Sequence, residues 1–128
     1  MEPRFREPRV LDERFLKRLR LIPCVVPRCS GRSEAAHIGL TDYNRGIVES
    51  GHARPHDFYC LPCCALHHRE SNGAEHVIGA EAFWARLGLD PFPLAANLYA
   101  IHQRHADDVT AIRKMRLAVL ETRFAIDD

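Results

Sequence analysis

The chain has 128 residues, enough for one domain and too few for two of ordinary size. Hydrophobic residues make up 46% and charged residues 27%, which predicts a soluble globular protein, and no apolar run approaches the roughly 20 residues that span a bilayer. The net charge is only +1, but residues 1–32 carry nine basic and four acidic side chains, a net charge of +5. That uneven charge favours contact with phosphate groups near the N-terminus.

The N-terminal half is predicted to form one helix and two short strands. Residues 1–10 contain two prolines and mixed charge, and we expect an extended basic arm there. Apolar residues recur at helical spacing from Leu11 to Ile22 and Pro23 follows, which predicts a helix over residues 11–22. Strands are predicted over residues 35–39 and 58–62, joined by a long polar loop. A short helix is predicted over residues 65–71.

A helical extension is predicted over residues 80–125. Its helices cover residues 80–88 with Gly88 as a stop, residues 93–105, and residues 108–125 with Asp108 as the N-cap. The apolar face expected on the last helix consists of Val109, Ile112, Val119, Leu120 and Phe124. The fold class predicted for the chain is α+β, a single domain over residues 1–128 with a zinc-stapled ββα core over residues 24–72.

Cysteine and histidine spacing predicts a zinc site. Residues 1–10 lack the apolar stretch of a secretory signal, so we expect a cytosolic protein, in which clustered cysteines favour a metal site over disulfides. A structural zinc takes four tetrahedral ligands from two close pairs. The first pair is Cys24 and Cys29. Two sets compete for the second pair, and both spacings fit: Cys60 with Cys63, and Cys64 with His67.

Strand geometry favours the second set. Cys60 lies inside the strand predicted over residues 58–62, whereas Cys64 and His67 follow at the turn into a helix, where zinc knuckles present their ligands. The residues therefore predict zinc ligation by Cys24, Cys29, Cys64 and His67, with the Cys60–Cys63 pair as the alternative.

Three further residues could act on a second, harder cation. His68 and Asn72 are four apart and would share one face of the predicted helix, where a nitrogen and an oxygen can hold a divalent ion. His37 precedes them on the first strand and could face them across the hairpin. This strand–loop–strand–helix constellation favours a site for chemistry beside the site for zinc.

In the order and spacing of these motifs the chain resembles the HNH endonuclease family, which has the ββα-metal fold. More narrowly, it resembles phage and prophage members of that family that carry an extra zinc site. The resemblance runs from about Arg6 to Leu98. The segments that carry it are "LIPC", "AAHI", "RPHD", "LPCCALHH" and "FWARLGLDP".

The resemblance implies a role for each candidate residue in a DNA endonuclease or nickase. His37 would be the general base that activates water, and Asp57 would orient the loop and that histidine. His68 would bind the catalytic cation, with Mg²⁺, Mn²⁺ or Ni²⁺ as candidates, and Asn72 stands where another ligand is often found. The structural zinc ligands would be Cys24, Cys29, Cys64 and His67.

Two positions depart from the family pattern. Ala36 stands where active members usually have a metal ligand, and Asn72 stands where this subgroup often has histidine. These departures support an alternative, a catalytically degenerate zinc module that binds nucleic acid or a protein. Other histidines that could supply a missing ligand are His52, His56 and His76, each of which is otherwise expected on the surface.

Partners are predicted from charge and from the unmatched C-terminus. Side chains of the first helix that are expected to contact DNA phosphates are Arg14, Lys17, Arg18 and Arg20. The helix over residues 108–125 lies beyond the resemblance and is a candidate contact for a protein partner or a second copy. No membrane association is expected, and the resemblance implies a phage- or prophage-encoded protein in the bacterial cytoplasm.

Overall fold

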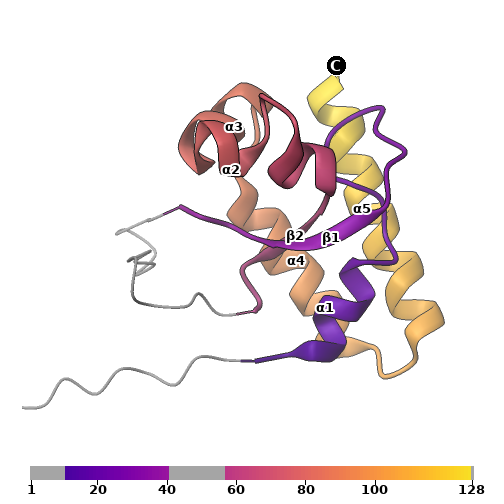
Figure 1. The fold of residues 1–128 in the computed structure, drawn as a ribbon. Coiled ribbons are helices and arrows are strands. Elements are labelled where there is room, and N and C mark those ends of the chain that lie inside the picture. Colours follow the sequence, from indigo (N-terminus) through magenta and orange to yellow (C-terminus); the bar gives the residue numbers. More distant parts are fainter. Residues whose placement is uncertain (1–10, 41–56, 128) are drawn as a thin grey trace, which may run out of the picture.

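The structure is a computed structural model, and it describes residues 11–40 and 57–127. The basic arm, His52 and His56 lie outside the described residues. The elements in chain order are α1 (Glu13–Leu19), β1 (Ser33–His37), β2 (Cys60–Cys64), η2 (Leu66–Glu70, a π-helical turn), α2 (Glu75–Ile78), α3 (Ala80–Leu87), α4 (Pro91–Arg104) and α5 (Asp108–Asp127) (Figure 1). The α+β class is therefore correct.

The sheet is a single antiparallel pair, β1 with β2. Ser33 lies opposite Cys64 and His37 lies opposite Cys60, so β1 begins two residues before, and β2 two residues after, the strands predicted from sequence. At this end of the hairpin Val25 N donates to Pro62 O at 2.9 Å, so the turn that carries Cys29 is hydrogen-bonded to β2.

Helices cover the hairpin from two sides. Figure 1 shows β1 and β2 crossing the middle of the molecule, with α2 and α3 above them and α1 below. α1 packs against both strands, and α4 packs against both β2 and α5. The core between them includes fully buried Phe15, Leu19, Leu61, Leu98 and Met115. Two short strands gain their stability from this packing, because an isolated hairpin is marginal in water.

The bounds of the C-terminal helices lie within two residues of those expected, and their capping differs at α5. α3 ends before Gly88, the stop that was predicted, and Gly88 adopts the left-handed conformation. α4 begins two residues earlier than expected, because the Asp90 side chain accepts a hydrogen bond from Phe92 N and Pro91 fits the first helical position. The cap of α5 is Asp107, whose carboxylate accepts from Thr110 N at 2.8 Å. The prediction of Asp108 as the cap is wrong, because that carboxylate is bonded to Arg18 instead.

The apolar residues that were predicted to form one face of α5 lie on two different sides of the helix. Val109 and Phe124 are 78% and 75% exposed. The buried face is instead made by small and medium side chains at helical spacing, namely Ala111, Met115, Ala118 and Val119. Across residues 11–40 and 57–127, the length and polarity of every helix rule it out as a membrane span.

Arg18 lies inside the molecule. Its side chain is 2% exposed, and its Nε donates to Asp108 Oδ1 at 2.8 Å. The two terminal nitrogens donate to three backbone carbonyls at the α4–α5 turn, those of His102, His105 and Ala106. The prediction that Arg18 contacts DNA phosphate is therefore wrong, because the guanidinium is buried and already holds α1 to the C-terminal helices.

The same guanidinium fixes the tautomer of His102. Arg18 Nη1 lies 2.9 Å from His102 Nδ1, and because a guanidinium only donates, Nδ1 must be the acceptor. His102 Nε2 therefore carries the proton when the ring is neutral, and it donates to Asp12 Oδ2 at 2.9 Å. Asp12 also caps α1 through Phe15 N and accepts from the Tyr99 hydroxyl. The start of α1 is thus bonded to α4 through side chains.

We expect replacement of Arg18 by Ala to lower the free energy of unfolding by about 3 kcal/mol, because several buried carbonyls lose their donors. A Lys17→Ala variant, altered at an exposed position on the same helix, should change it by less than about 0.5 kcal/mol. Urea unfolding followed by circular dichroism measures both. Equal unfolding midpoints for the two variants would contradict this account of Arg18.

Candidate metal centre

Four sulfur and nitrogen donors converge at one end of the hairpin. Cys24 and Cys29 come from the turn after α1, Cys64 ends β2, and His67 lies in η2. Their donor atoms all lie within 4.8 Å of one another, so the grouping favoured from sequence is the one that the structure assembles. The alternative grouping with Cys60 and Cys63 is not found among the described residues, because neither sulfur belongs to this cluster.

The distances suit one tetrahedral ion. Bonds of about 2.3 Å to sulfur and 2.1 Å to nitrogen place tetrahedral donors roughly 3.6 to 3.8 Å apart. Cys29 Sγ lies 3.5 Å from Cys64 Sγ, and Cys24 Sγ lies 3.8 Å from His67 Nδ1. The Cys64 Sγ to His67 Nδ1 distance is 3.0 Å and would lengthen by about half an ångström. The cluster can therefore hold a metal such as zinc through three sulfurs and His67 Nδ1.

The turn that carries Cys24 and Cys29 comes close to Cys64. Gly31 N donates to Cys29 Sγ at 3.3 Å, and a Cβ added at Gly31 would lie 2.9 Å from Cys64 Cβ. Arg28 adopts a φ of 65°, which is uncommon for a residue with a side chain. Val25 N donates to Pro62 O and so fastens this turn to β2. A glycine at position 31 is required because there is no room for a side chain beside Cys64.

Hydrogen bonds and burial lower the pKa of one cysteine and raise the pKa values of two others. A hydrogen bond from Cys63, aided by backbone donors and opposed by burial, lowers the pKa of Cys24 to about 4. Burial raises the pKa of Cys64 to about 11. The bond to Cys24, with burial, likewise raises the pKa of Cys63. Cys63 is thus a thiol donor to the candidate ligand Cys24, and metal binding would have to displace the proton of Cys64.

His37 and Asp57 form a second pair at the other end of β1. His37 Nε2 lies 3.3 Å from Asp57 Oδ1, and the histidine side chain is 32% exposed while the aspartate is buried. Asp57 Oδ2 accepts from Asp12 N at 2.8 Å, so its carboxylate is held by the start of α1. This contact is the one that the resemblance implies for an aspartate that orients a histidine.

Asp12 links that pair to the buried network. Burial acts to raise its pKa, but hydrogen bonds from Phe15 N and His102 outweigh it and hold the pKa of Asp12 below its ordinary value. The carboxylate is therefore ionised at neutral pH and remains an acceptor for α1 and α4. Asp57, the carboxylate beside His37, is bonded to the backbone of Asp12 at the start of α1. Asp12 is in turn bonded to His102 of α4.

The expected pairing of His68 with Asn72 is not found. η2 ends at Glu70 and Ser71 is extended, with ψ at 163°, so the helical spacing that would align the two side chains is interrupted. Asn72 is exposed. His68 Nδ1 lies 3.0 Å from Glu34 Oε1, and the His68 and His76 rings have centroids 4.3 Å apart. Sequence reasoning named His76 only as a possible ligand and missed Glu34.

His37 and His68 serve different sides of the hairpin. Glu34 and His37 are three apart on β1, so their side chains leave opposite faces of the strand. Glu34 contacts His68 and Arg69 of η2, and its hydrogen bonds with these residues, Arg69 first, lower the pKa of Glu34 to about 2. His37 faces the start of α1 instead. The expectation that His37 faces His68 and Asn72 across the hairpin is therefore wrong.

The remaining basic candidates lie on the surface of α1. Arg14 donates to the Ala106 carbonyl and lies 3.5 Å from Asp108. Arg20 lies 3.3 Å from Glu13, and Lys17 is exposed. These contacts are to exposed groups, which are screened by solvent and can exchange for phosphate.

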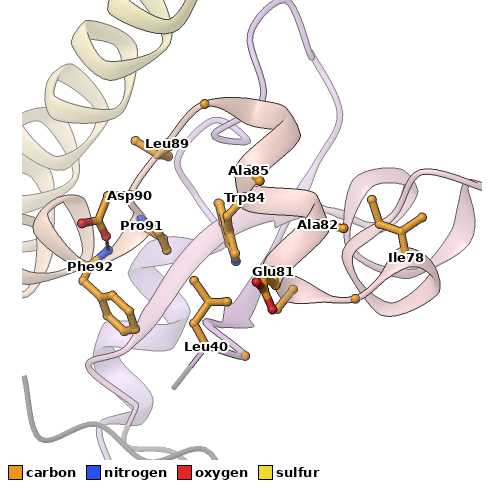
Figure 2. Close-up of a pocket in the computed structure, with 14 residues that line it drawn as sticks. Leu40, Ile78, Glu81, Ala82, Trp84, Ala85, Leu89, Asp90, Pro91 and Phe92 are labelled. Atoms are coloured by element: carbon orange, nitrogen blue, oxygen red, sulfur yellow. Dashed lines mark hydrogen bonds between the residues drawn. The ribbon is translucent and has the colours of Figure 1, made fainter. Parts of the chain in front are cut away.

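A surface pocket of about 1230 Å³ lies apart from these groups. It is bounded by the residues after β1, by α3 and by the start of α4, and Figure 2 shows Trp84 beside Leu40 within it. Trp84 Nε1 is buried with no hydrogen-bond acceptor among the described residues. None of the candidate site residues lines the pocket, so it is not a candidate for the chemistry.

A Cys64→Ser variant should lose its metal and much of its stability, because a structural zinc supplies folding free energy. Cys60→Ala is the matched control at the same strand, and it should keep about one zinc per chain. Gly31→Ala should weaken metal retention through the clash with Cys64. Elemental analysis of the purified proteins and thermal unfolding with and without chelator measure these effects. Loss of metal in Cys60→Ala alone would instead support the alternative ligand pair.

The two ends of the hairpin offer different chemistry. The Cys24–His67 end is a closed set of four donors, suited to stabilising the fold. The His37–Asp57 end offers a partly exposed imidazole held by a buried carboxylate, suited to moving a proton. Comparisons with protein-family models, with curated proteins and with solved structures found no match for this chain.

Proposed function

We propose that the protein is a metal-dependent DNA endonuclease or nickase of the HNH type, stabilised by a structural zinc at Cys24, Cys29, Cys64 and His67. The observation that carries the proposal is the His37–Asp57 pair, a half-buried imidazole oriented by a buried carboxylate at the end of β1. The order of the sequence motifs supports the same assignment.

The pair suits the removal of a proton from water. If His37 Nε2 donates to Asp57 Oδ1, Nδ1 is the atom that a neutral imidazole leaves to accept a proton from water. Asp57 is a positioning residue, because it acts through His37. A divalent cation held at His68 would supply charge neutralisation at the phosphate and at the leaving oxygen.

The basic surface of α1 lies next to this pair. Asp12 N, directly before α1, bonds to Asp57, and exposed Arg14, Lys17 and Arg20 follow on the helix. A DNA backbone that lies along α1 would therefore pass close to His37. Such contacts position the duplex without reading its sequence.

One observation favours a second candidate function. His37 and His68 lie on opposite faces of β1, and Asn72 is not beside His68. A protein in which the base and the cation ligand remain apart would be a zinc module that binds nucleic acid or a protein partner without cleaving it. Cleavage and binding measurements separate the two candidates.

Plasmid cleavage with added Mg²⁺, Mn²⁺ or Ni²⁺ tests catalysis. We expect His37→Ala to lower the rate by roughly 10²–10⁴-fold, the usual contribution of a general base, and Asp57→Asn to lower it less. His105→Ala removes a histidine near the α4–α5 turn and should leave the rate unchanged. Absence of metal-dependent cleavage in the wild type, or equal rates in all variants, would reject the nuclease.

DNA binding at several salt concentrations tests the second candidate together with the first. Fluorescence anisotropy should give an affinity that falls steeply with salt, and a Lys17→Ala/Arg20→Ala variant should reduce the logarithmic slope by about 2, one for each lost phosphate contact. A slope near zero would exclude DNA as the partner and leave a protein partner as the remaining candidate.

A further inference from the structure

The outward side of α5 carries a row of large apolar side chains, which we call the outer row. Leu117 is 56% exposed, Leu120 39% and Phe124 75%. Their spacing of three and four residues places them on one side of the helix, opposite the buried Ala111 and Met115. Figure 1 shows α5 along one side of the molecule, where α4 packs against its inner side. An exposed apolar row with polar residues beside it is typical of an interaction surface.

We infer that the outer row binds a second copy of the same chain, through two α5 helices that pack side by side and antiparallel. A two-fold axis makes such a contact reciprocal, so each residue pairing occurs twice. With the axis between Ala118 and Val119, Leu117 of each copy lies opposite Leu120 of the other. The two central layers of the contact are then made of leucine alone.

The same register gives Phe124 a basic partner. Arg113 is exposed on the outward side of α5, four residues before Leu117 and in line with it. In the antiparallel pair, Arg113 of one copy lies opposite Phe124 of the other. The stem of an arginine can cover an aromatic ring while its guanidinium is attracted to the face of that ring. The largest exposed side chain of the row is therefore covered in this register.

Two opposite charges beside the outer row support a second copy as the partner. Lys114 and Glu121 are both exposed, and the residues three and four positions from each of them on α5 are uncharged. Neither side chain is therefore paired within its own helix. In the antiparallel pair, both lie on the flank where the two helices meet, so Lys114 of each copy lies beside Glu121 of the other. One dimer thus contains two such ion pairs.

A parallel pair of helices suits these charges less well. It would set Arg113 of one copy against Arg113 of the other, and it would leave Lys114 beside Val109 with no acid. The other flank of the antiparallel pair carries Arg116 and Arg123. Arg123 is half-buried and its Nη1 donates to Cys24 O at 3.3 Å, so this guanidinium is turned toward its own chain. The charge pattern therefore favours the antiparallel arrangement.

Sedimentation velocity on the full chain, without DNA, tests the interface. The wild type should change from monomer to dimer between about 10 and 500 μM, because one helix from each copy makes a small interface. Leu120→Glu should weaken dimerisation at least about tenfold, since a carboxylate would enter an apolar layer. Val77→Glu changes an exposed apolar residue of α2 and should dimerise as the wild type does. A wild type that stays monomeric throughout this range would overturn the inference.

Charge exchange tests the register without changing an apolar residue. Lys114→Glu and Glu121→Lys each set like charges together twice in the dimer, and each should weaken dimerisation about tenfold. An equal mixture of the two variants should form a heterodimer of about wild-type affinity, because both of its pairs then have opposite charges. Unchanged dimerisation of either variant alone, or no gain in the mixture, would overturn the antiparallel pairing.

The dimer and the nuclease can fail separately, because dimerisation is measured without DNA or metal-dependent cleavage. A dimer that obeys the charge exchange, in a protein that cleaves no plasmid, would reject the nuclease and keep the interface. Cleavage by a protein that is monomeric at every concentration would reject the interface and keep the nuclease.

Discussion

A hairpin of two five-residue strands is marginally stable in water, and this constraint explains what surrounds β1 and β2. At one end lie the four donors that could hold a metal, contributed by the turn after α1, the end of β2 and η2. The other end is held by Asp57, which bonds to the start of α1. Both ends are therefore fastened by polar side chains, while apolar side chains of α1 and α4 cover the strands between them.

The buried guanidinium of Arg18 connects α1, whose start holds Asp57, to α4 and α5. It bonds three carbonyls at the α4–α5 turn, one nitrogen of His102 and the carboxylate of Asp108. His102 in turn bonds Asp12, which caps α1. A charge that is this well partnered can be buried without a large penalty, and it fixes the orientation of α1 relative to α4 and α5. The position of His37 depends on that orientation, because Asp57 is held by the backbone of Asp12.

A structural metal site and a site for phosphodiester hydrolysis need different arrangements of side chains around the hairpin. A structural metal needs only that four donors stay within reach of one ion, and the knuckle around Gly31 meets that requirement locally. Phosphodiester hydrolysis needs a base and a cation on the same phosphate, and the hairpin places His37 and His68 on opposite faces.

The sequence by itself determined the spacing within each pair of candidate zinc ligands, Cys24 with Cys29 and Cys64 with His67, and the extents of α3 and most of α4. Spacing within a pair, helical periodicity and turn residues depend on neighbours in the chain, so they can be recognised without a structure. The contact of His37 with Asp57 was an implication of the family resemblance. The tertiary structure alone decided the burial of Arg18, the bounds of β1 and β2, and the placement of Glu75 and His76 rather than Asn72 beside His68. The burial and the strand bounds depend on contacts between segments far apart in the chain, and the third feature depends on a π-helical turn that breaks the expected helical spacing, so no local pattern specifies them.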